Sequence, residues 1–257
     1  MGEAPIGGVM KLVIESASSF KKSIDAIAAL IDEAEFIANE NGLTLKATDP
    51  SQIAMIDFEL PKSAFKEFNV EGELKIGIDM DYLRQVVSRA KSDDTLVLEL
   101  NPEATTLNIT FKGKSQRSFS IPLIDVSKGQ IPNPKIEFEA DVKMKAGLLQ
   151  DALKDAELIS GHVVFGVTSD CFYVSANSSK GTLRNETKKD EDAIIKFDVK
   201  KECKAMFPLE YLKDMLKTPS SNDEITVHLR TDAPVRIDFN IDKARVTYYL
   251  APRIEAE

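Results

Sequence analysis

The sequence predicts an α+β fold made of two similar domains, each with antiparallel sheets covered by two helices. Two observations predict it. The chain repeats itself at one constant shift, which places Leu149 opposite Phe20, and each half contains two units of a strand, a short helix and a pair of strands. Strand pairs interleaved with single helices are typical of antiparallel α+β domains.

The repeat is clearest in two amphipathic segments. Apolar residues at helical spacing correspond between the halves, namely Phe20 with Leu149, Ile24 with Leu153, Ile27 with Ala156 and Leu30 with Ile159. The same shift places MDYLRQVV (80–87) on LEYLKDML (209–216), and DDTLVLEL (93–100) on the segment around DEITVHL (223–229). Because one shift aligns several separate elements, we interpret the chain as a duplicated domain.

The first half shows the order of elements most plainly. They are a strand over 10–16, a helix over 18–34, a hairpin over 35–48, a strand over 73–79, a helix over 80–91 and strands at 95–100 and 106–113. The hairpin is indicated by alternating apolar residues on both sides of Asn41-Gly42, a pair that favours tight turns.

Closely spaced prolines and one glycine separate the two halves. Pro122, Pro132 and Pro134, with Gly129 among them, favour an extended and stiffened connector. We therefore expect an N-terminal extension at 1–9, a first domain at 10–124, an interdomain connector at 125–135 and a second domain at 136–257.

Composition narrows the class of protein. The net charge of −9 argues against a protein that adheres to nucleic acid over its whole surface. No apolar run approaches the about 18 residues of a membrane helix, and the first residues lack a signal-peptide pattern. The two cysteines, Cys171 and Cys203, form no metal or redox motif. We expect a cytoplasmic protein without a membrane partner.

The sequence offers little catalytic chemistry. Its two histidines, His162 and His228, have no partner at metal-ligand spacing, and His228 alternates within a strand pattern as a structural histidine does. Asp79 and Asp81 come nearest to a carboxylate pair, but their place before a helix favours a role in capping its free amides. We predict no enzyme activity, no metal site and no cofactor.

Basic residues lie outside the apolar faces of the predicted helices. They are Lys21 and Lys22 on the first helix, Arg84, Arg89 and Lys91 on the second, Lys154 on the third, and Lys213 and Lys217 on the fourth. Acidic residues are interspersed among them, so the pattern alone favours an ordinary solvated helix face.

Four segments carry a family resemblance. They are GLTLKATDPSQIAMIDFELP (42–61), GIDMDYLRQVVSRAKSDDTLVLEL (77–100), FPLEYLKDMLK (207–217) and DAPVRIDFNIDKARVTYYLAPRIE (232–255). They resemble the DNA sliding clamps of archaea and eukaryotes, the proliferating cell nuclear antigen family. The likeness runs from about Met10 to Glu255, and its most specific part is the terminal Leu-Ala-Pro-Arg-Ile-Glu. It implies a closed trimeric ring whose helices line a hole for duplex DNA.

The resemblance also implies a pocket for client proteins on the outer face of the ring. DNA polymerase, clamp loader, flap endonuclease, ligase and similar clients carry a Gln-x-x-aliphatic-x-x-aromatic-aromatic peptide that enters such a pocket. Carried over by motif, the pocket residues are Gln52, Ile53, Met55, Ile131, Pro234, Tyr249, Leu250, Ala251 and Pro252. An exposed apolar cluster of this size usually marks a binding site. The alternative is that Tyr248 and Tyr249 merely finish an edge strand. Thr48 and Gly129 depart from the family pattern at the rim of the pocket.

The same resemblance changes the interpretation of the basic helix faces. It implies that these eight residues face the hole and contact DNA phosphates without reading bases. It further implies that segment 105–114 of one subunit pairs with segment 173–185 of the next. We expect a homotrimer, with a ring of different subunits as the alternative, that serves as a nucleoid-associated processivity factor in DNA replication and DNA repair.

Two other functions compete with this one. The first is a clamp relative that works in damage signalling within a mixed ring, which homotrimer formation would argue against. The second is a carboxylate-dependent nuclease or hydrolase that uses Asp79 and Asp81. In that case Asp79→Asn would abolish a turnover that depends on a divalent metal.

Overall fold

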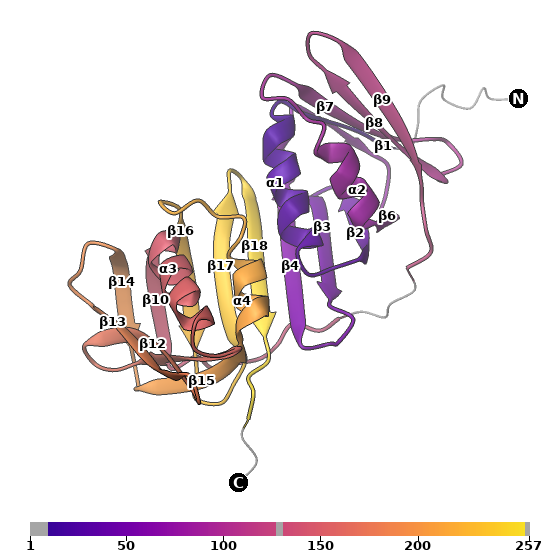
Figure 1. Cartoon of the computed structure of the whole chain (residues 1–257). Helices are drawn as coiled ribbons and strands as arrows, with labels where there is room; N and C mark the ends of the chain where they lie inside the picture. The colour runs from indigo at the N-terminus through magenta and orange to yellow at the C-terminus, as the bar shows by residue number, and fades with distance from the viewer. Residues whose placement is uncertain (1–9, 127–130, 255–257) are drawn as a thin grey trace, which may run out of the picture. The chain divides into compact units, whose positions relative to one another are not determined.

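Figure 1 shows a computed structural model, which describes residues 10–126 and 131–254. The extension predicted at 1–9, connector residues 127–130 with Gly129, and residues 255–257 lie outside the described residues. The chain forms two compact units. The first comprises residues up to Ala47, Asp57–Ile131 and Ile241–Arg245, and the second comprises Thr48–Ile56, Pro132–Asn240 and the residues from Val246. Each unit thus includes a short segment from the other half of the sequence.

Within its described residues, the first half contains two helices, a short 3-10 turn and nine strands. In chain order they are β1 (Met10–Ile14), α1 (Ala17–Ala28), β2 (Glu33–Asn39), β3 (Gly42–Thr48), β4 (Ala54–Pro61), η1 (Lys62–Ala64), β5 (Glu67–Val70), β6 (Leu74–Asp79), α2 (Met80–Val87), β7 (Thr95–Leu100), β8 (Thr106–Lys112) and β9 (Gln116–Pro122). The strands β5-β1-β7-β8-β9 form one antiparallel sheet, and β4-β3-β2-β6 are consecutive neighbours in another. Helices α1 and α2 lie side by side over these strands (Figure 1).

The second half repeats this arrangement. Its elements are β10 (Ala140–Lys145), α3 (Ala146–Glu157), β11 (His162–Val167), β12 (Cys171–Ser178), β13 (Gly181–Lys188), β14 (Ile194–Val199), β15 (Cys203–Pro208), α4 (Leu209–Met215), β16 (Glu224–Leu229), β17 (Val235–Ile241) and β18 (Ala244–Leu250). The strands β14-β10-β16-β17-β18 are consecutive neighbours, and β13-β12-β11-β15 form a separate four-stranded sheet. Helices α3 and α4 again lie together.

The structure confirms the duplication. The shift that places Leu149 opposite Phe20 also carries both ends of α1 onto the ends of α3, and both ends of β6, β7 and β8 onto those of β15, β16 and β17. The apolar faces correspond as well, because Phe20, Ile24 and Ile27 of α1 are buried in one unit and Leu149 and Leu153 of α3 in the other. One folding pattern therefore builds both cores.

The first two helices are shorter than the sequence suggests. Helix α1 ends at Ala28 rather than at 34, because the chain turns there into β2, which pairs with β6 from Glu33 onward. Helix α2 ends at Val87 rather than at 91, so Arg89 and Lys91 lie beyond it. Tertiary strand pairing therefore overrides the helical periodicity at the end of α1. After α2, the N–H groups of Arg89 and Ala90 bond the carbonyls of Val86 and Val87, three residues back, so the chain leaves the α-helix in a tighter turn.

The predicted edge strand is also wrong. Segment 105–114 contains β8, which is paired on one side with β7 and on the other with β9, so it has no free edge. The edge strands of that sheet are β5 and β9, and β9 is the one next to β8. In the second unit, segment 173–185 includes the interior strand β12 and the first residues of β13, which is the edge strand. The unpaired edges in question are therefore β9 and β13.

Candidate functional site

A tight turn before β4 presents the first residues of the predicted pocket. Its hub is Asp49, whose carboxylate accepts hydrogen bonds from the N–H groups of Ile53 and Ala54, both at 2.8 Å. The same carboxylate accepts the hydroxyl of Tyr211 at 2.8 Å. Gln52 sits at φ 59°, a left-handed conformation that few residues other than glycine adopt. The turn therefore holds Gln52 outward on a fixed backbone.

The Asp49 carboxylate is stabilised in its charged form. Burial alone raises the pKa of this carboxyl, but the hydrogen bonds from Ala54, Tyr211, Ile53 and Ser51 outweigh burial and leave the pKa below its usual value. A charged group that bonds several backbone amides keeps the turn in one conformation.

The C-terminal segment is tied to the second unit by two backbone bonds. The N–H of Ala251 donates to the carbonyl of Ile53 at 2.8 Å, and the N–H of Arg253 donates to the carbonyl of Met206 at 2.7 Å. Chain ends usually fray unless they are held in this way. The bonds fix Ala251 next to the turn that carries Gln52.

The predicted pocket residues differ in how they meet solvent. Gln52 is exposed, and the half-buried members are Ile53, Ile131, Pro234, Tyr249, Ala251 and Pro252. By contrast, Leu250 is 0% exposed and Met55 is 6% exposed, so both belong to the core. All of these residues except Ile131 fall in the second unit. Within the second unit, solvent therefore reaches Gln52 and the half-buried members, whereas Leu250 and Met55 lie in the core.

A row of charged side chains extends from Tyr249. The guanidinium of Arg236 lies 6.0 Å from the centre of the Tyr249 ring, and its Nε bonds Asp238 at 3.0 Å. His228 then bridges Asp238 and Asp141, with ring nitrogens at 2.9 and 2.5 Å from the two carboxylates. His228 is therefore a structural histidine, as its strand pattern predicts.

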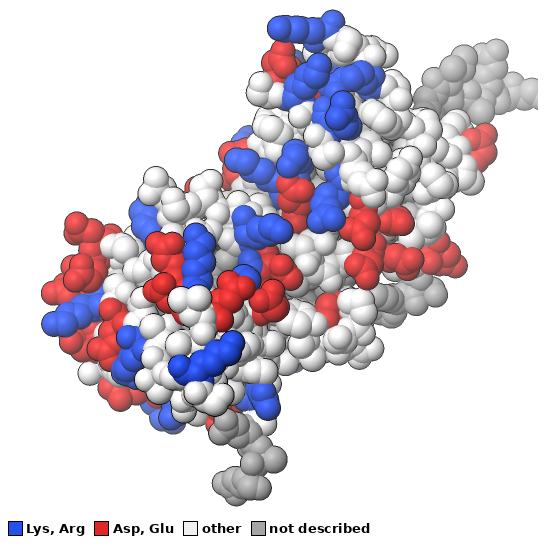
Figure 2. Space-filling model, in the orientation of Figure 1, with Lys and Arg blue, Asp and Glu red and all other residues white. Residues whose placement is uncertain are grey.

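The predicted DNA-contacting residues lie at the surface of their units. Lys22, Arg84, Arg89, Lys91, Lys154 and Lys217 are exposed, whereas Lys21 and Lys213 are half-buried. Lys217 lies beyond the end of α4, as Arg89 and Lys91 lie beyond α2. Figure 2 shows basic and acidic side chains interspersed over the helix-bearing side of each unit.

Half of these basic residues are paired with nearby acids. Lys21 bonds Asp25 at 2.7 Å, Arg84 lies 3.3 Å from Asp81, Lys154 lies 3.7 Å from Asp151, and Lys213 bonds Glu157 at 2.6 Å. Exposed pairs of this kind contribute little stability, and their partial neutralisation weakens the positive potential around them.

The loop after α2 is held by a buried ion pair. Asp94 is 1% exposed, accepts the N–H of Lys91 at 2.7 Å and pairs with Arg117. Arg117 also donates to the carbonyl of Arg89 at 2.7 Å. The side chains of Arg89 and Lys91 are thus displayed on an ordered loop.

The described residues show neither a metal cluster nor a membrane helix. Within 10–126 and 131–254, no three His, Cys, Asp or Glu side chains are grouped so that they could hold a metal ion. In those same ranges, no helix has the length and apolar character needed to cross a membrane. Asp79 accepts the N–H of Tyr82 at 2.9 Å, which confirms the predicted helix cap.

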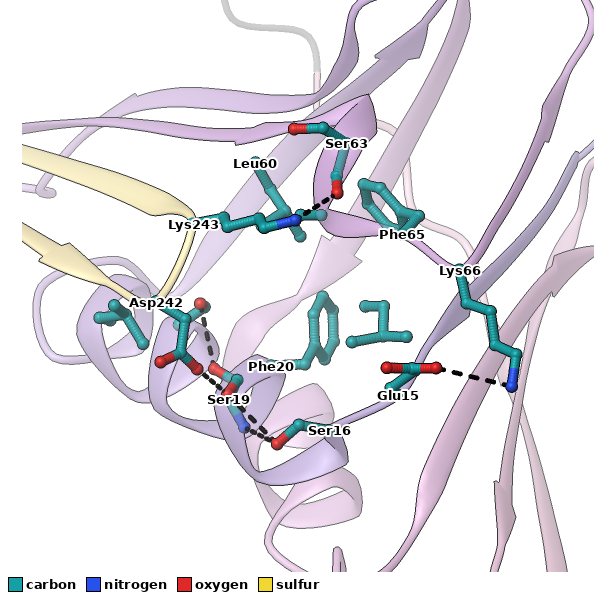
Figure 3. A pocket seen from close by; sticks show the side chains of 14 residues that line it. Glu15, Ser16, Ser19, Phe20, Leu60, Ser63, Phe65, Lys66, Asp242 and Lys243 are labelled. Atoms are coloured by element: carbon teal, nitrogen blue, oxygen red, sulfur yellow. Dashed lines mark hydrogen bonds and ion pairs between the residues drawn. The ribbon is translucent and has the colours of Figure 1, made fainter.

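A separate cavity of about 410 Å³ opens in the first unit (Figure 3). It is lined by apolar side chains such as Phe20 and rimmed by polar groups. The Ser19 hydroxyl bonds Asp242, and the Lys243 ammonium bonds the carbonyl of Ser63 at 2.8 Å. Its rim groups pair with one another, and we assign the cavity no role.

Comparison with known families agrees with the duplication. Residues 9–129 match the model for the N-terminal domain of proliferating cell nuclear antigen, and residues 131–254 match the model for its C-terminal domain. The chain belongs to the proliferating cell nuclear antigen family. The likeness therefore covers both halves.

Relatives and solved structures of this family cover almost the whole chain. The DNA polymerase sliding clamp of Methanococcus maripaludis is 38% identical over 242 residues, which are 92% of this chain and 96% of the relative. The crystal structure of proliferating cell nuclear antigen from Thermococcus kodakaraensis superposes with a TM-score of 0.91 at 28% identity, covering 95% of this chain and 100% of that one. That from A. fulgidus, bound to the C-terminal region of FEN-1, gives 0.88 at 31% identity, covering 96% and 100%.

Motif reasoning within this family missed the two residues that shape the turn. Asp49 and Tyr211 are far apart in the sequence, yet they meet at 2.8 Å. The signal available in the sequence was Asp49 itself, because Asp before Pro favours a turn held by the aspartate side chain. Its partner on α4 carries no comparable local signal.

Proposed function

We propose that this chain is a DNA sliding clamp. Three copies form a closed ring around duplex DNA, act as a polymerase processivity factor and dock replication and repair proteins on the outer face. The observation that carries the proposal is the duplicated fold, matched in both halves to proliferating cell nuclear antigen and 38% identical to a DNA polymerase sliding clamp.

The repeat supports a specific pairing between copies. Strands β4 and β18 are hydrogen-bonded neighbours. The shift that relates the two halves places β4 opposite β13 and β18 opposite β9, and both β13 and β9 are edge strands of their sheets. Strand β9 of one copy and β13 of the next therefore have the sequence relationship of strands already paired within the chain. We propose that they pair in the same way, which also protects two exposed edges.

DNA contact is assigned to the basic residues of the helix-bearing faces. We propose that Lys22, Arg89, Lys91 and Lys217 supply most of the positive potential, since no ion pair to an acidic side chain of the described residues is formed by them. Lys21, Arg84, Lys154 and Lys213 contribute less because nearby carboxylates offset their charge. Contacts to phosphate alone allow the ring to slide and weaken with salt.

Client docking is assigned to the half-buried apolar residues around the C-terminal segment. We propose that Ile53, Pro234, Tyr249, Ala251 and Pro252 contact the client peptide, with Gln52 at the rim and Ile131 as a wall from the connector. Leu250 and Met55 support the site from the core, where they are 0% and 6% exposed. The clamp has no catalytic activity of its own in this proposal, and in an archaeal cell it works at the nucleoid. We propose domain boundaries of 10–124 and 136–257, with the connector at 125–135 between them.

The topology of DNA binding tests this function. A clamp loaded onto nicked circular DNA by a clamp loader should stay bound when the salt concentration is raised, because a ring cannot leave a closed circle. Cutting the circle once should release it by sliding off the end. Equal retention on circular and linear DNA would overturn the proposal, as would a monomeric mass of the chain, 28.4 kDa, in sedimentation at micromolar concentration.

A separate measurement tests the pocket. Tyr249→Ala should weaken the binding of a motif peptide in calorimetry while the trimer persists. Leu250 is unsuitable for this test, because its truncation would open a cavity in the core. Unchanged peptide affinity in Tyr249→Ala would contradict the assignment of this residue.

A further inference from the structure

A groove of about 570 Å³ lies in the second unit, over one face of the sheet β13-β12-β11-β15. His162, Val164, Arg184 and Met206 contribute to its walls, together with Arg253, whose backbone bonds that of Met206. Arg253 follows Pro252 directly, so the groove begins where the proposed client pocket ends. The two features share the C-terminal segment.

The charge in this groove differs from that of the chain as a whole. The chain carries a net charge of −9, yet none of the residues that line the groove in the described part of the chain is acidic. Two guanidinium groups face it, from Arg184 and Arg253, together with the hydroxyls of Ser175 and Thr182. A concave site with several hydrogen-bond donors and no carboxylate suits an anionic ligand.

Arg253 is held in place without being neutralised. Its N–H donates to the carbonyl of Met206, and its guanidinium nitrogen lies 3.1 Å from both ring nitrogens of His162. Because this Arg253 nitrogen is equally distant from both ring nitrogens, it lies over the face of the imidazole and does not point at the lone pair of either nitrogen. Burial, and then the charge of Arg253, lower the pKa of His162, so the ring is neutral at pH near 7. No ion pair joins Arg253 to a carboxylate within residues 10–126 and 131–254.

Arg184 is also oriented in advance. Its guanidinium carbon lies 3.9 Å from the centre of the Tyr173 ring, and its Nε donates to Glu186. A guanidinium has five N–H donors, and a bond from Nε leaves the terminal nitrogens able to bind a second carboxylate. Because stacking already fixes the side chain, little rotational entropy is lost when a ligand binds.

We propose that this groove binds an acidic flank of the client peptide, a short run of Asp or Glu next to the docking motif. The proposal rests on the proposed docking function and names the chemistry that extends it. A peptide is favoured over a nucleic acid because the groove continues from the client pocket through Pro252 and Arg253. Carboxylates on an extended chain can reach both guanidinium groups as bidentate partners.

Four peptides test the proposal by calorimetry with the full-length trimer at low salt. All carry the same motif: one has no extension, one has Asp-Glu-Asp before it, one has Asp-Glu-Asp after it and one has Asn-Gln-Asn at both ends. One of the acidic peptides should bind about fivefold more tightly than the neutral one, as expected for two exposed charge pairs. The gain should diminish as salt is added.

Matched variants separate the groove from general charge effects. Arg184→Gln with Arg253→Gln should abolish the gain and leave the affinity for the peptide without an extension unchanged. The control, Lys180→Gln with Lys196→Gln, removes the same charge from exposed positions that neither line the groove nor lie in β13, and it should retain the gain. Equal affinity for acidic and neutral peptides overturns the inference, and so does a gain that survives in the groove variant.

Two further outcomes of the calorimetry separate a failure of the docking function from a failure of the groove assignment. If the peptide without an extension does not bind, the docking function fails rather than the groove. If a single-stranded oligonucleotide competes with the acidic flank at equal charge, the groove binds phosphate and the assignment to a peptide is overturned.

Discussion

The two units share one scaffold but expose different strands of it. In the first unit β9 alternates between exposed and half-buried residues along most of its length, whereas β18, its counterpart in the repeat, is largely buried. In the second unit β13 alternates in the same way, whereas its counterpart β4 is largely buried. The fold is therefore equivalent in the two halves, and the side chains decide which strands remain open for another copy.

The largest expected effect is a proline placed in equivalent strands. Ala54→Pro in β4 removes the N–H that bonds Asp49 and inserts proline into an interior strand, so it should cost about 3 kcal/mol or more of unfolding free energy. At the equivalent place in β13, Thr182→Pro or Leu183→Pro should instead release monomers, since one of these adjacent N–H groups faces away from β12. Urea denaturation and sedimentation distinguish the two effects.

If the prolines in β4 and β13 had the same effect, the difference between an interior strand and a joining edge strand would be wrong. A trimer that survives both β13 variants would show that β13 is not the joining strand. Normal stability of Ala54→Pro would show that β4 tolerates an edge-strand residue in spite of its burial.

Local periodicity predicted much of this fold. The helix faces of α1 and α3, the Asp79 cap and the hairpin around Asn41 depend on neighbouring residues, and all are present. The hairpin turn, however, lies one residue earlier than the predicted Asn41-Gly42, because Gly42 already pairs with Asn39 as the first residue of β3. A β-carbon on Gly42 would lie 2.3 Å from the Leu60 carbonyl, a clash that no local pattern reveals.

The remaining features depend on contacts distant in sequence. The edge strands follow from sheet order, which strand patterns do not contain, and helix α1 ends where β2 must meet β6. In the candidate site, the motif located the right segments but could not tell that Leu250 faces the core while Tyr249 remains half-buried. Alternation along a strand assigns faces only once its partners on both sides are known.

The next effect concerns two tyrosines at equivalent positions of α2 and α4. Tyr211 bonds the buried Asp49 carboxylate, whereas its counterpart Tyr82 is 46% exposed. Tyr211→Phe should cost about 2 kcal/mol because it removes a hydrogen bond to a charged group, and Tyr82→Phe should stay within about 0.5 kcal/mol of the parent. Equal losses in urea denaturation would contradict the role assigned to the Asp49 turn.

The same turn has a defined dependence on pH. The folded-state pKa of Asp49 is lowered, so the stability it contributes is complete above its unfolded pKa, about 3.9. It should be lost as the pH falls through the lowered value. In Asp49→Asn that part of the acid-induced loss should be absent.

A smaller effect separates the two histidines by the sign of their pH dependence. Burial lowers the pKa of His228, but its hydrogen bonds to Asp238 and Asp141 outweigh burial and raise it. Its contribution is therefore complete below about pH 6.5 and lost as pH rises through the raised value. For His162 the pKa is lowered, so its protonation destabilises the fold as pH falls below about 6.5.

Substituting each histidine tests these opposite pH dependences. His228→Gln should lose more stability at about pH 6 than at about pH 8, because the contribution it removes is present only at the lower pH. His162→Gln should show the reverse slope, since it removes a group whose protonation disfavours the fold. Parallel slopes in urea denaturation at the two pH values would refute the assigned environments.

The smallest effect lies at the helix starts, where the two units use different chemistry. Ser16 caps α1 by accepting the N–H of Ser19 at 3.3 Å, whereas Lys145 at the equivalent place in α3 makes no side-chain cap. Ser16→Ala should therefore cost about 1 kcal/mol.

Lys145→Ser introduces a capping side chain at the start of α3. It should raise the free energy of unfolding by less than Ser16→Ala lowers it. Both helices bond their first amide, since Ala17 donates to the carbonyl of Asp94 at 3.0 Å and Ala146 to that of Asp223 at 2.8 Å. In α3 the second amide is bonded as well, because Gly147 donates to the carbonyl of Ser221 at 2.9 Å. Gly147 allows this approach, because a β-carbon there would lie 3.0 Å from Ser221. Because fewer N–H groups in the first turn of α3 lack a partner, a serine at position 145 adds less stability. A full reciprocal gain in urea denaturation would mean that these backbone bonds do not replace a cap.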